Sequence, residues 1–279
     1  MKRLQLLCAL ALIVFVLSGC AEMNRPSAPA APPSSSPVLD RILASGELRV
    51  GMSGDMPPLN MVSKENKLIG MDADIARLTA DAMGVKLNLQ KMQFSQLLAA
   101  LEAGKIDMII SNMTMTPDRN LKVVFVGPYL VSGKGLLTKD GVLTNAKSMK
   151  DINSPKFTFV VLKGSTSEAV TKVGAPQAKL VTVANENEGV QMVIDGRADA
   201  MLSDISICAV AAYRNPSAGL VAVTAPITYE PIGIAIPKGD PQLTNWLQNF
   251  VNGLDKGGYM KELGEKWLGK PTWIDQVQF

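Results

Sequence analysis

The chain has 279 residues, of which 47% are hydrophobic and 19% are charged. This composition excludes a disordered protein and provides enough apolar residues for two α/β lobes. The formal net charge of +3 gives no reason to expect a nucleic acid as partner. The sequence contains no histidine, so the commonest general base and the usual metal ligand are missing. We therefore expect neither a metal site nor a cofactor.

Residues 1–19 are predicted to be an export signal. "MKR" supplies a positive region, "LQLLCALALIVFVL" is an apolar run too short to cross a bilayer comfortably, and "LSGC" ends at Cys20. The last motif resembles a bacterial lipobox, which implies cleavage before Cys20 and a lipid anchor, such as palmitate, on its thiol. An ordinary signal peptide, or a membrane anchor that contains a cysteine, is the alternative.

Residues 20–39 are predicted to be an extended tether, because "AEMNRPSAPAAPPSSSP" has almost nothing to bury. The folded part should begin near Val38. Cys208 would be the one further thiol of the mature chain, so we expect no intramolecular disulfide. It lies in the apolar run "ISICAVAAY" and is interpreted as a core residue rather than a nucleophile.

From Glu47 onward, strand patterns alternate with helix patterns. The first helix shows Ile75 and Leu78 on one face and ends at Gly84. The predicted strands are 47–52, 85–90, the last part of 94–111, 157–162, 178–183 and 198–203, and the predicted helices are 72–84, the first part of 94–111, one from Thr166, and one through Met192. This alternation predicts an α/β fold with parallel sheets.

Two segments of the chain repeat the same pattern. "LEAGKIDMIIS" (101–111) and "VIDGRADAMLS" (193–203) each contain a helix end, a glycine, a basic residue, an aspartate, a strand and a final serine. The repeat predicts two similar lobes. Ligands of open α/β sheets bind beyond the carboxyl ends of strands, so "NMTMTPDR" (112–119) and "DIS" (204–206) should face a cleft.

The residues at these two strand ends suit a zwitterion. Arg119 can hold a carboxylate with two parallel hydrogen bonds, and Asp204 can hold an ammonium. The turn "KGSTSE" (163–168), with the Thr166 hydroxyl, favours an anion at a helix start. Each feature has a structural alternative: Arg119 on the surface, the turn as a plain helix cap, and Asp204 as a cap of the next helix.

The motifs "LRVGMSGDMPPL", "GMDADIARLTADAMG", "FSQLLAALEAGKIDMIISNMTMTPDR", "VGPYLVSG", "VLKGSTSE" and "GRADAMLSD", together with the segment 232–269, resemble the extracellular solute-binding proteins of family 3 from about Leu43 to Trp267. The resemblance implies a two-lobed periplasmic-binding-protein-like fold of type II with a hinge of two crossover strands. Lobe 1 would be discontinuous, 40–132 and 234–279, and lobe 2 would be 136–230.

The resemblance also implies roles for individual residues. Arg119 and the helix-start residues Ser165 and Thr166 would hold the ligand carboxylate, and Asp204 its ammonium. Oxygens of Asn112 and Thr114 would take the remaining ammonium protons. Asn112 is bulkier than the usual residue there and could narrow the site.

Selectivity for the ligand side chain is expected in the first loop and the second helix. Phe94 matches one position of a common aromatic sandwich, and Met56 holds the other, where it could also be simple packing. Ser53 occupies a position that is often acidic in members that bind basic or amide side chains, although Asp55 is close enough to confuse the alignment. Lys163 precedes the Gly/Ser/Thr turn and could equally be a solvated charge. These residues predict a neutral polar or acidic amino acid.

The implied function is that of a substrate-binding lipoprotein of an ABC importer, a monomer at the periplasm or outer cell surface that delivers its ligand to a permease and ATPase. An enzyme is not expected. The alternatives are a cyclohexadienyl-dehydratase-like enzyme on the same fold and a sensory amino-acid-binding lipoprotein. Glu168 matches an acid of the dehydratase motif "GGTNE", but this sequence reads "GSTSE" and lacks the asparagine.

Overall fold

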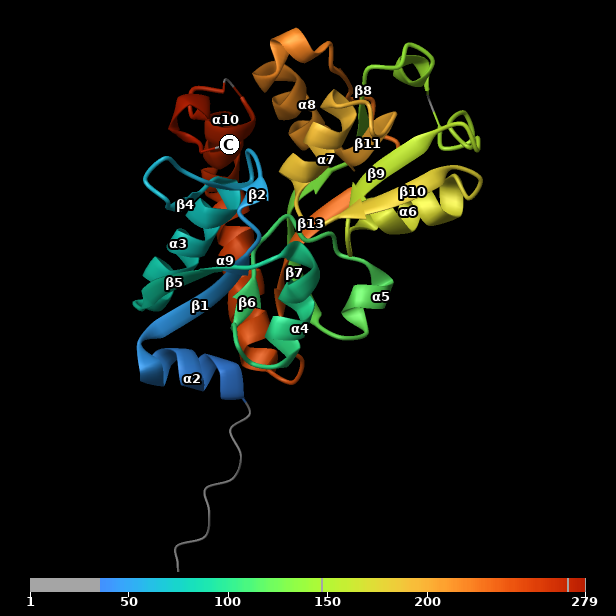
Figure 1. Ribbon diagram of the computed structural model, residues 1–279. Coiled ribbons are helices and arrows are strands. Elements are labelled where there is room, and N and C mark those ends of the chain that lie inside the picture. The colour runs from blue at the N-terminus through green and yellow to red at the C-terminus, as the bar shows by residue number, and fades with distance from the viewer. Residues whose placement is uncertain (1–35, 147, 270, 279) are drawn as a thin grey trace, which may run out of the picture. The chain divides into compact units, whose positions relative to one another are not determined.

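The computed structural model describes residues 36–278, apart from 147 and 270. The predicted signal, Cys20 and most of the predicted tether lie outside the described residues. The folded part is one compact unit. Within the described residues it contains two five-stranded sheets and one small three-stranded sheet, with helices on both large sheets (Figure 1).

The first large sheet has the strand order β5-β1-β6-β13-β7. Strand β1 pairs in parallel with β5 and β6, whereas β13 is antiparallel to both β6 and β7. Helix α3 lies on β1 and β5, α4 on β1 and β6, and α9 on β7. The bounds are β1 Glu47–Met52, β5 Lys86–Lys91, β6 Met108–Ile109, β7 Val124–Ser132, β13 Glu230–Ile236, α3 Met71–Met83, α4 Leu97–Glu102 and α9 Pro241–Lys256.

The second large sheet has the order β10-β9-β11-β8-β12. Strands β10, β9 and β11 are parallel, and β8 is antiparallel to both β11 and β12. Helices α6, α7 and α8 pack on this sheet (Figure 1). The bounds are β8 Lys134–Thr138, β9 Thr158–Leu162, β10 Lys179–Val183, β11 Ala200–Asp204, β12 Val221–Val223, α6 Thr166–Gly174, α7 Glu186–Ile194 and α8 Ile205–Arg214.

The small sheet and the remaining helices complete the unit. Its strands β2, β3 and β4 pair antiparallel in sequence order. Helix α2 and helix α10 both contact α9. The bounds are β2 Asp55–Met56, β3 Asn60–Val62, β4 Leu68–Ile69, α2 Pro37–Ser45, α5 Pro117–Asn120 and α10 Tyr259–Leu268, and the short 3-10 turns are Phe94–Gln96, Leu143–Asn145, Pro216–Ala218 and Ile274–Gln276.

The local sequence signals correctly place most of these elements. Helix α3 buries Ile75, Ala76 and Ala80 on one face, and Gly84 ends it in the left-handed conformation at φ 67°. The helix predicted after Phe94 starts as a 3-10 turn, and the strand that follows pairs over two residues only.

The predicted strands pair in parallel, as expected, and the antiparallel pairs come from strands that were not predicted. Strands β7 and β13 in one sheet, and β8 and β12 in the other, run antiparallel to a neighbour. These strands carry the chain between the sheets, without the helical crossover that forces a parallel pair. The chain passes from β7 to β8 at Gly133, where a Cβ would lie 2.5 Å from Pro226 Cβ and 2.7 Å from the Thr228 carbonyl oxygen. This close approach of the returning segment requires glycine.

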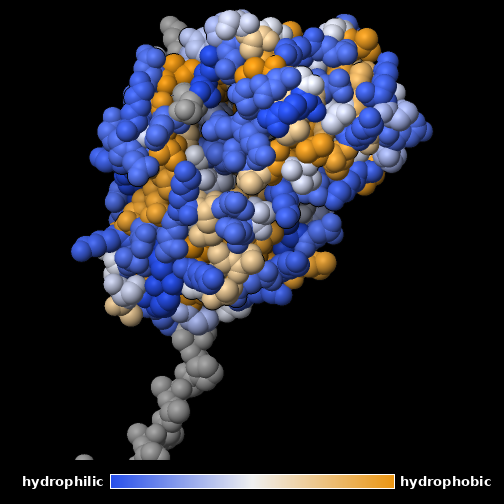
Figure 2. All heavy atoms as spheres, viewed as in Figure 1, coloured by the Kyte–Doolittle hydropathy of each residue, from blue (hydrophilic) through white to orange (hydrophobic). Residues whose placement is uncertain are grey.

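Three apolar clusters form the core, and the second contains residues from both large sheets and from the first loop. It includes Met56, Phe94, Leu162 and Cys208. Cys208 is 1% exposed, as expected for a core residue. Among the described residues no helix is both long and apolar enough to cross a membrane. Figure 2 shows a largely hydrophilic face with separate apolar patches, as is normal for a folded protein in water.

Candidate ligand site between the lobes

Each large sheet and the helices packed on it form one lobe. Arg119 is buried where the two lobes meet. Helix α5 begins at Pro117, and the Thr116 hydroxyl accepts a hydrogen bond from the Arg119 N–H, which fixes the turn. Nη1 of Arg119 donates to the Thr114 carbonyl oxygen (2.8 Å), and Nη2 donates to the Gly164 carbonyl oxygen of the other lobe (3.1 Å). The guanidinium lies over the Phe94 ring, 5.6 Å from its centroid. Burial lowers the pKa of Arg119 to about 10, so it stays charged at neutral pH.

The backbone at the end of β6 is held by a buried carboxylate. Asp72 Oδ2 accepts hydrogen bonds from Asn112 N (2.9 Å) and from Asn60 Nδ2 (2.7 Å), and Asp72 Oδ1 accepts one from the Tyr129 hydroxyl. Asn112 adopts φ 48°, a left-handed conformation that asparagine tolerates better than most residues. Burial raises the pKa of Asp72 to about 6. Asp72 therefore positions Asn112 at the mouth of the junction.

Asp204 does not cap the helix that follows it, because its side chain makes no hydrogen bond to the start of α8. It faces the other lobe instead. Its Oδ2 accepts from Asn112 Nδ2 at 2.5 Å, and its Oδ1 lies 3.1 Å from Lys134 Nζ. All three side chains are buried. The structure thus brings Asp204 and Asn112 together, as expected for a shared site, and adds a lysine that was not predicted.

Glu230, at the start of β13, joins the two predicted hydroxyl groups. Its Oε2 accepts hydrogen bonds from Thr114 Oγ1 (2.8 Å) and from Thr166 Oγ1 (2.9 Å), which come from opposite lobes. Thr228 Oγ1 donates to Oε1. Burial alone would raise the pKa of Glu230, but Lys134 Nζ at 3.8 Å and the three hydroxyl groups hold it below its usual value. Glu230 is therefore an ionised acceptor that bridges the lobes.

The remaining predicted site residues make contacts other than the ones expected of ligand-binding side chains. Ser165 caps α6 by accepting from Glu168 N, and it also donates to the Leu162 carbonyl oxygen, so the plain cap interpretation describes its side chain. Lys163 is exposed. Met56 and Phe94 are buried in the same apolar cluster. Ser53 Oγ donates to Asn60 Oδ1 within one lobe.

Lys134 and Glu230 are two members of this site that the sequence did not reveal. Lys134 follows a glycine and precedes the apolar run of β8, and Glu230 begins the apolar strand β13. A single charged residue at the edge of a buried strand is the signal that could have found both of them.

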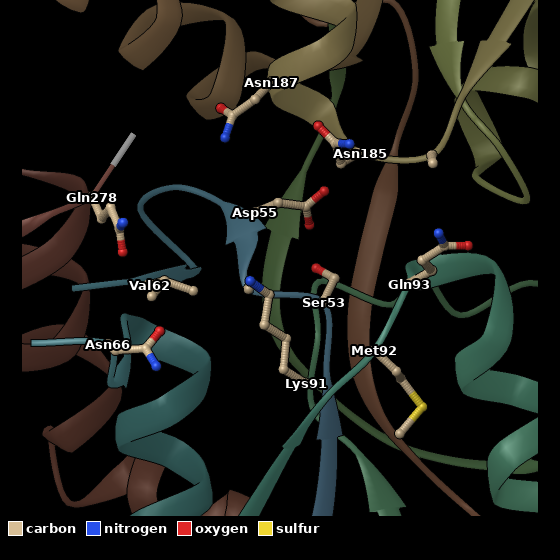
Figure 3. Close-up of a pocket in the computed structure, with 12 residues that line it drawn as sticks. Ser53, Asp55, Val62, Asn66, Lys91, Met92, Gln93, Asn185, Asn187 and Gln278 are labelled. Atoms are coloured by element: carbon tan, nitrogen blue, oxygen red, sulfur yellow. The ribbon is translucent and has the colours of Figure 1, made fainter. Parts of the chain in front are cut away.

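A cavity of about 630 Å³ lies between residues of the two lobes. Ser53, Asp55 and Lys91 line it from the first lobe, and Asn185 and Asn187 line it from the start of α7 (Figure 3). Ser53 is the one predicted site residue among its lining residues. The polar lining suits a hydrophilic ligand.

Two features of the described side chains concern metal binding and the match to the dehydratase motif. Within the described part of the chain no group of three or more His, Cys, Asp or Glu side chains could hold a metal ion. Glu168, the one match to the dehydratase motif, forms an ion pair with Lys172 and accepts a hydrogen bond from Gly164 N. Both contacts stabilise the start of α6.

Buried side chains of both charges lie between two α/β lobes. A site of this kind defines a two-lobed ligand-binding protein. The particular family follows from the sequence: the chain belongs to the bacterial extracellular solute-binding proteins, family 3, whose profile matches residues 48–270.

Individual relatives differ in what they do. The chain is 25% identical to the cyclohexadienyl dehydratase of Pseudomonas aeruginosa, over 82% of this chain and 85% of that protein. It is 26% identical to the L-cystine-binding protein TcyJ of Escherichia coli, over 83% and 86%. Among solved structures it is similar to a binding component of an ABC transporter from Wolinella succinogenes complexed with lysine, at 40% identity and a TM-score of 0.78, covering 82% of this chain and 99% of that one. These similarities show that the chain has the two-lobed fold of the amino-acid-binding members of this family.

Proposed function

We propose that this protein is the substrate-binding lipoprotein of an ABC importer, and that it closes its two lobes over an amino acid. Its partners are then a membrane permease and an ATPase, and its place is the periplasm or outer cell surface, as a lipid-anchored monomer. Lobe 1 comprises 40–132 and 234–279, and lobe 2 comprises 136–230. Family membership and the binding components among the relatives support this role.

The proposal rests on two contacts between the lobes. Arg119 donates to the Gly164 carbonyl oxygen, and the Thr114 and Thr166 hydroxyl groups lie within hydrogen-bond distance of each other. An α-carboxylate entering between the lobes replaces the carbonyl oxygens that now accept from the guanidinium. It gains a charge-assisted pair of hydrogen bonds in a water-excluded site. The ammonium then lies at Asp204 and displaces the Asn112 amide or Lys134 from it. Closure strengthens these contacts because it removes water.

The lipid anchor rests on the motif "LSGC" that ends at Cys20. Cys20→Ser should leave the protein unacylated and release it from the membrane fraction of the expressing cell. Mass spectrometry of the N-terminal peptide checks the acylation. Retention of the variant in the membrane fraction would contradict the anchor.

The amino-acid role is tested by a thermal-shift screen of the chain from Ala21 onward, unfolded and refolded to remove bound ligand. The screen covers all proteinogenic amino acids, prephenate and arogenate. A ligand at 100 times its Kd adds about 2.7 kcal/mol to the free energy of unfolding and raises Tm. A rise with one or a few amino acids supports the proposal. A rise with prephenate or arogenate alone, followed by product formation, would replace it by the dehydratase alternative, which the similarity to the Pseudomonas aeruginosa enzyme keeps as the second candidate.

The preference for a neutral or acidic side chain rested on Lys163 and on Ser53 at a position that is acidic in some relatives. Lys163 is exposed, and Asp55 lines the cavity beside Ser53. An acidic side chain would therefore meet a carboxylate in this cavity. A neutral polar side chain is compatible with its lining.

A further inference from the structure

Two acidic residues from opposite lobes meet beside the proposed amino-acid site. Asp55 lies in β2, and Glu186 is the first residue of α7. The Glu186 N–H donates to Asp55 Oδ2 at 3.0 Å, so the two residues are in direct contact. Glu186 is 4% exposed, and its Oε1 accepts from Ser203 Oγ at 3.1 Å. The contact therefore places two carboxyl groups close together between the lobes, and the Asp55 carboxylate helps to raise the pKa of Glu186.

Three acceptor oxygens in this region have no hydrogen-bond partner. They are Glu186 Oε2, Asp55 Oδ1 and Asn112 Oδ1, and all three are buried. Buried acceptors are almost always hydrogen-bonded in folded proteins, so three unpaired ones in neighbouring side chains call for a donor. Asn112 is hydrogen-bonded to Asp204, and Asp204 is close enough to Glu186 to raise its pKa. The unpaired oxygens thus adjoin the expected position of the ligand ammonium.

The charges around the cleft do not balance. The buried or half-buried carboxyl groups are those of Asp55, Asp72, Glu186, Asp204 and Glu230, whereas the buried cations are Lys134 and Arg119. Lys134 forms ion pairs with both Asp204 and Glu230. Neither Asp55 nor Glu186 forms an ion pair with a described residue, although Lys91 is near enough to lower the pKa of Asp55 slightly. An additional cation between Asp55 and Glu186 would reduce this excess of acidic groups.

The cavity opens at Asp55 and next to the buried Glu186. Its lining includes Asp55 and the two residues that flank Glu186, Asn185 and Asn187. In Figure 3 the Asp55 side chain lies between those of Ser53 and Asn185, which come from opposite lobes. A side chain that extends from an α-carbon near Asp204 toward the cavity would therefore pass Asp55 and Glu186.

We propose that Asp55, Glu186 and the side-chain oxygen Oδ1 of Asn112 form a subsite for the cationic end of a basic amino acid, either an ammonium or a guanidinium. The inference rests on the proposed function, since it requires the α-groups of the ligand to bind at Arg119 and Asp204. The cation enters while the lobes are apart, and closure then brings Glu186 of one lobe and Asp55 of the other onto it. The bound cation donates hydrogen bonds to the three unpaired oxygens. It also lies between the carboxylates of Asp55 and Glu186 and so weakens their repulsion.

The test compares each basic ligand with a neutral analogue of the same shape. Ligand-stripped protein is titrated calorimetrically with L-arginine against L-citrulline, and with L-lysine against Nε-acetyl-L-lysine. At least one basic ligand should bind about tenfold or more tightly than its neutral analogue. In Glu186→Gln this ratio should fall to about threefold or less. Glu188→Gln, two residues further along α7 and exposed, is the matched control and should keep the wild-type ratio.

A measurement on the unaltered protein keeps the test decisive if Glu186→Gln does not fold. Burial, Asp55 of β2 and Asp204 of β11 raise the pKa of Glu186 to about 8, against the lowering effects of the Ser203 hydroxyl and of Lys134 in β8. Glu186 therefore holds a proton at pH 7 that a bound cation displaces. Titration in two buffers of different ionisation enthalpy should show proton release with the basic ligand and none with its neutral analogue.

The outcomes separate the subsite from the proposed function. Tighter binding of the neutral analogues, or an unchanged ratio in Glu186→Gln, overturns the subsite. Binding of a neutral amino acid without any basic one also overturns it, while the receptor role stands. Absence of binding by every amino acid overturns both.

Discussion

Lys134 Nζ lies 3.1 Å from Asp204 Oδ1, so the carboxylate expected to hold a ligand ammonium already has a cation beside it. Both side chains are buried, at 3% and 4% exposure. Removing one partner of such a pair leaves an uncompensated buried charge, which typically costs about 3–5 kcal/mol. Lys134 is thus a stabilising partner of Asp204, and it would compete with an ammonium that binds there as proposed.

Lys134→Met should lower the stability of the ligand-free protein by roughly 3–5 kcal/mol. For a chain of this size, each kcal/mol lowers Tm by about 2–4 °C, and calorimetry measures the change. Lys179→Met, at an exposed position of β10, is the control and should change Tm little. Equal Tm values for the two variants would show that Lys134 does not stabilise Asp204.

Arg119→Ala should weaken amino-acid binding by about 2–5 kcal/mol, since it removes a buried cation from the proposed carboxylate. Isothermal calorimetry with the ligand found in the thermal-shift screen gives the Kd. Arg77→Ala, which removes an exposed guanidinium from a local pair with Asp74, should leave the Kd unchanged. An unaltered affinity in Arg119→Ala contradicts the carboxylate assignment.

Glu230→Ala should favour the open form of the ligand-free protein. The carboxylate accepts hydrogen bonds from Thr114 of one lobe and Thr166 of the other, and each bond to a charged acceptor contributes about 1.5–3 kcal/mol. Small-angle scattering should show a larger radius of gyration in the variant than in the wild type. Glu262→Ala, on the exposed side of α10, is the control. Identical scattering curves would mean that Glu230 does not hold the lobes together.

The stability of the ligand-free protein should decrease as the pH rises from about 5 to about 8. Burial raises the pKa of Asp72 from 3.8 to about 6 and that of Glu186 from 4.5 to about 8. The folded state therefore binds protons that the unfolded chain has already released, and their stabilising effect is complete below the unfolded pKa and lost as the pH passes the folded one. Glu186→Gln should flatten the upper part of this curve of Tm against pH. The same slope in wild type and variant would contradict the raised pKa of Glu186.

Cys208 should not react with a thiol reagent while the protein is folded. It is 1% exposed, and burial raises the pKa of its thiol. The chain from Ala21 onward with Cys20 absent should take up one equivalent of 5,5′-dithiobis(2-nitrobenzoate) in denaturant and almost none in native buffer. Rapid labelling under native conditions would show that α8 opens readily.

The amino-acid sequence by itself determined the two alternating α/β units, and it placed Arg119, Thr166 and Asp204 at or beyond the ends of strands. Helix α3 with its Gly84 stop, and the repeat of 101–111 in 193–203, are local patterns of burial and turn chemistry, so they can be recognised without a partner segment. The strand ends follow from them, because side chains just beyond a parallel strand share one edge of the sheet.

Only the tertiary structure decided which charges meet at the site and which strands turn antiparallel. Lys134 and Asp204 are 70 residues apart, and Asp55 and Glu186 are 131 apart. Such contacts depend on how the two sheets are placed relative to each other by the strands that connect them, β7, β8 and β13. The hydrophobic pattern of a single segment does not contain this information. The physical reason is that burial and charge pairing act on distance in space, whereas sequence patterns report only the immediate neighbours along the chain.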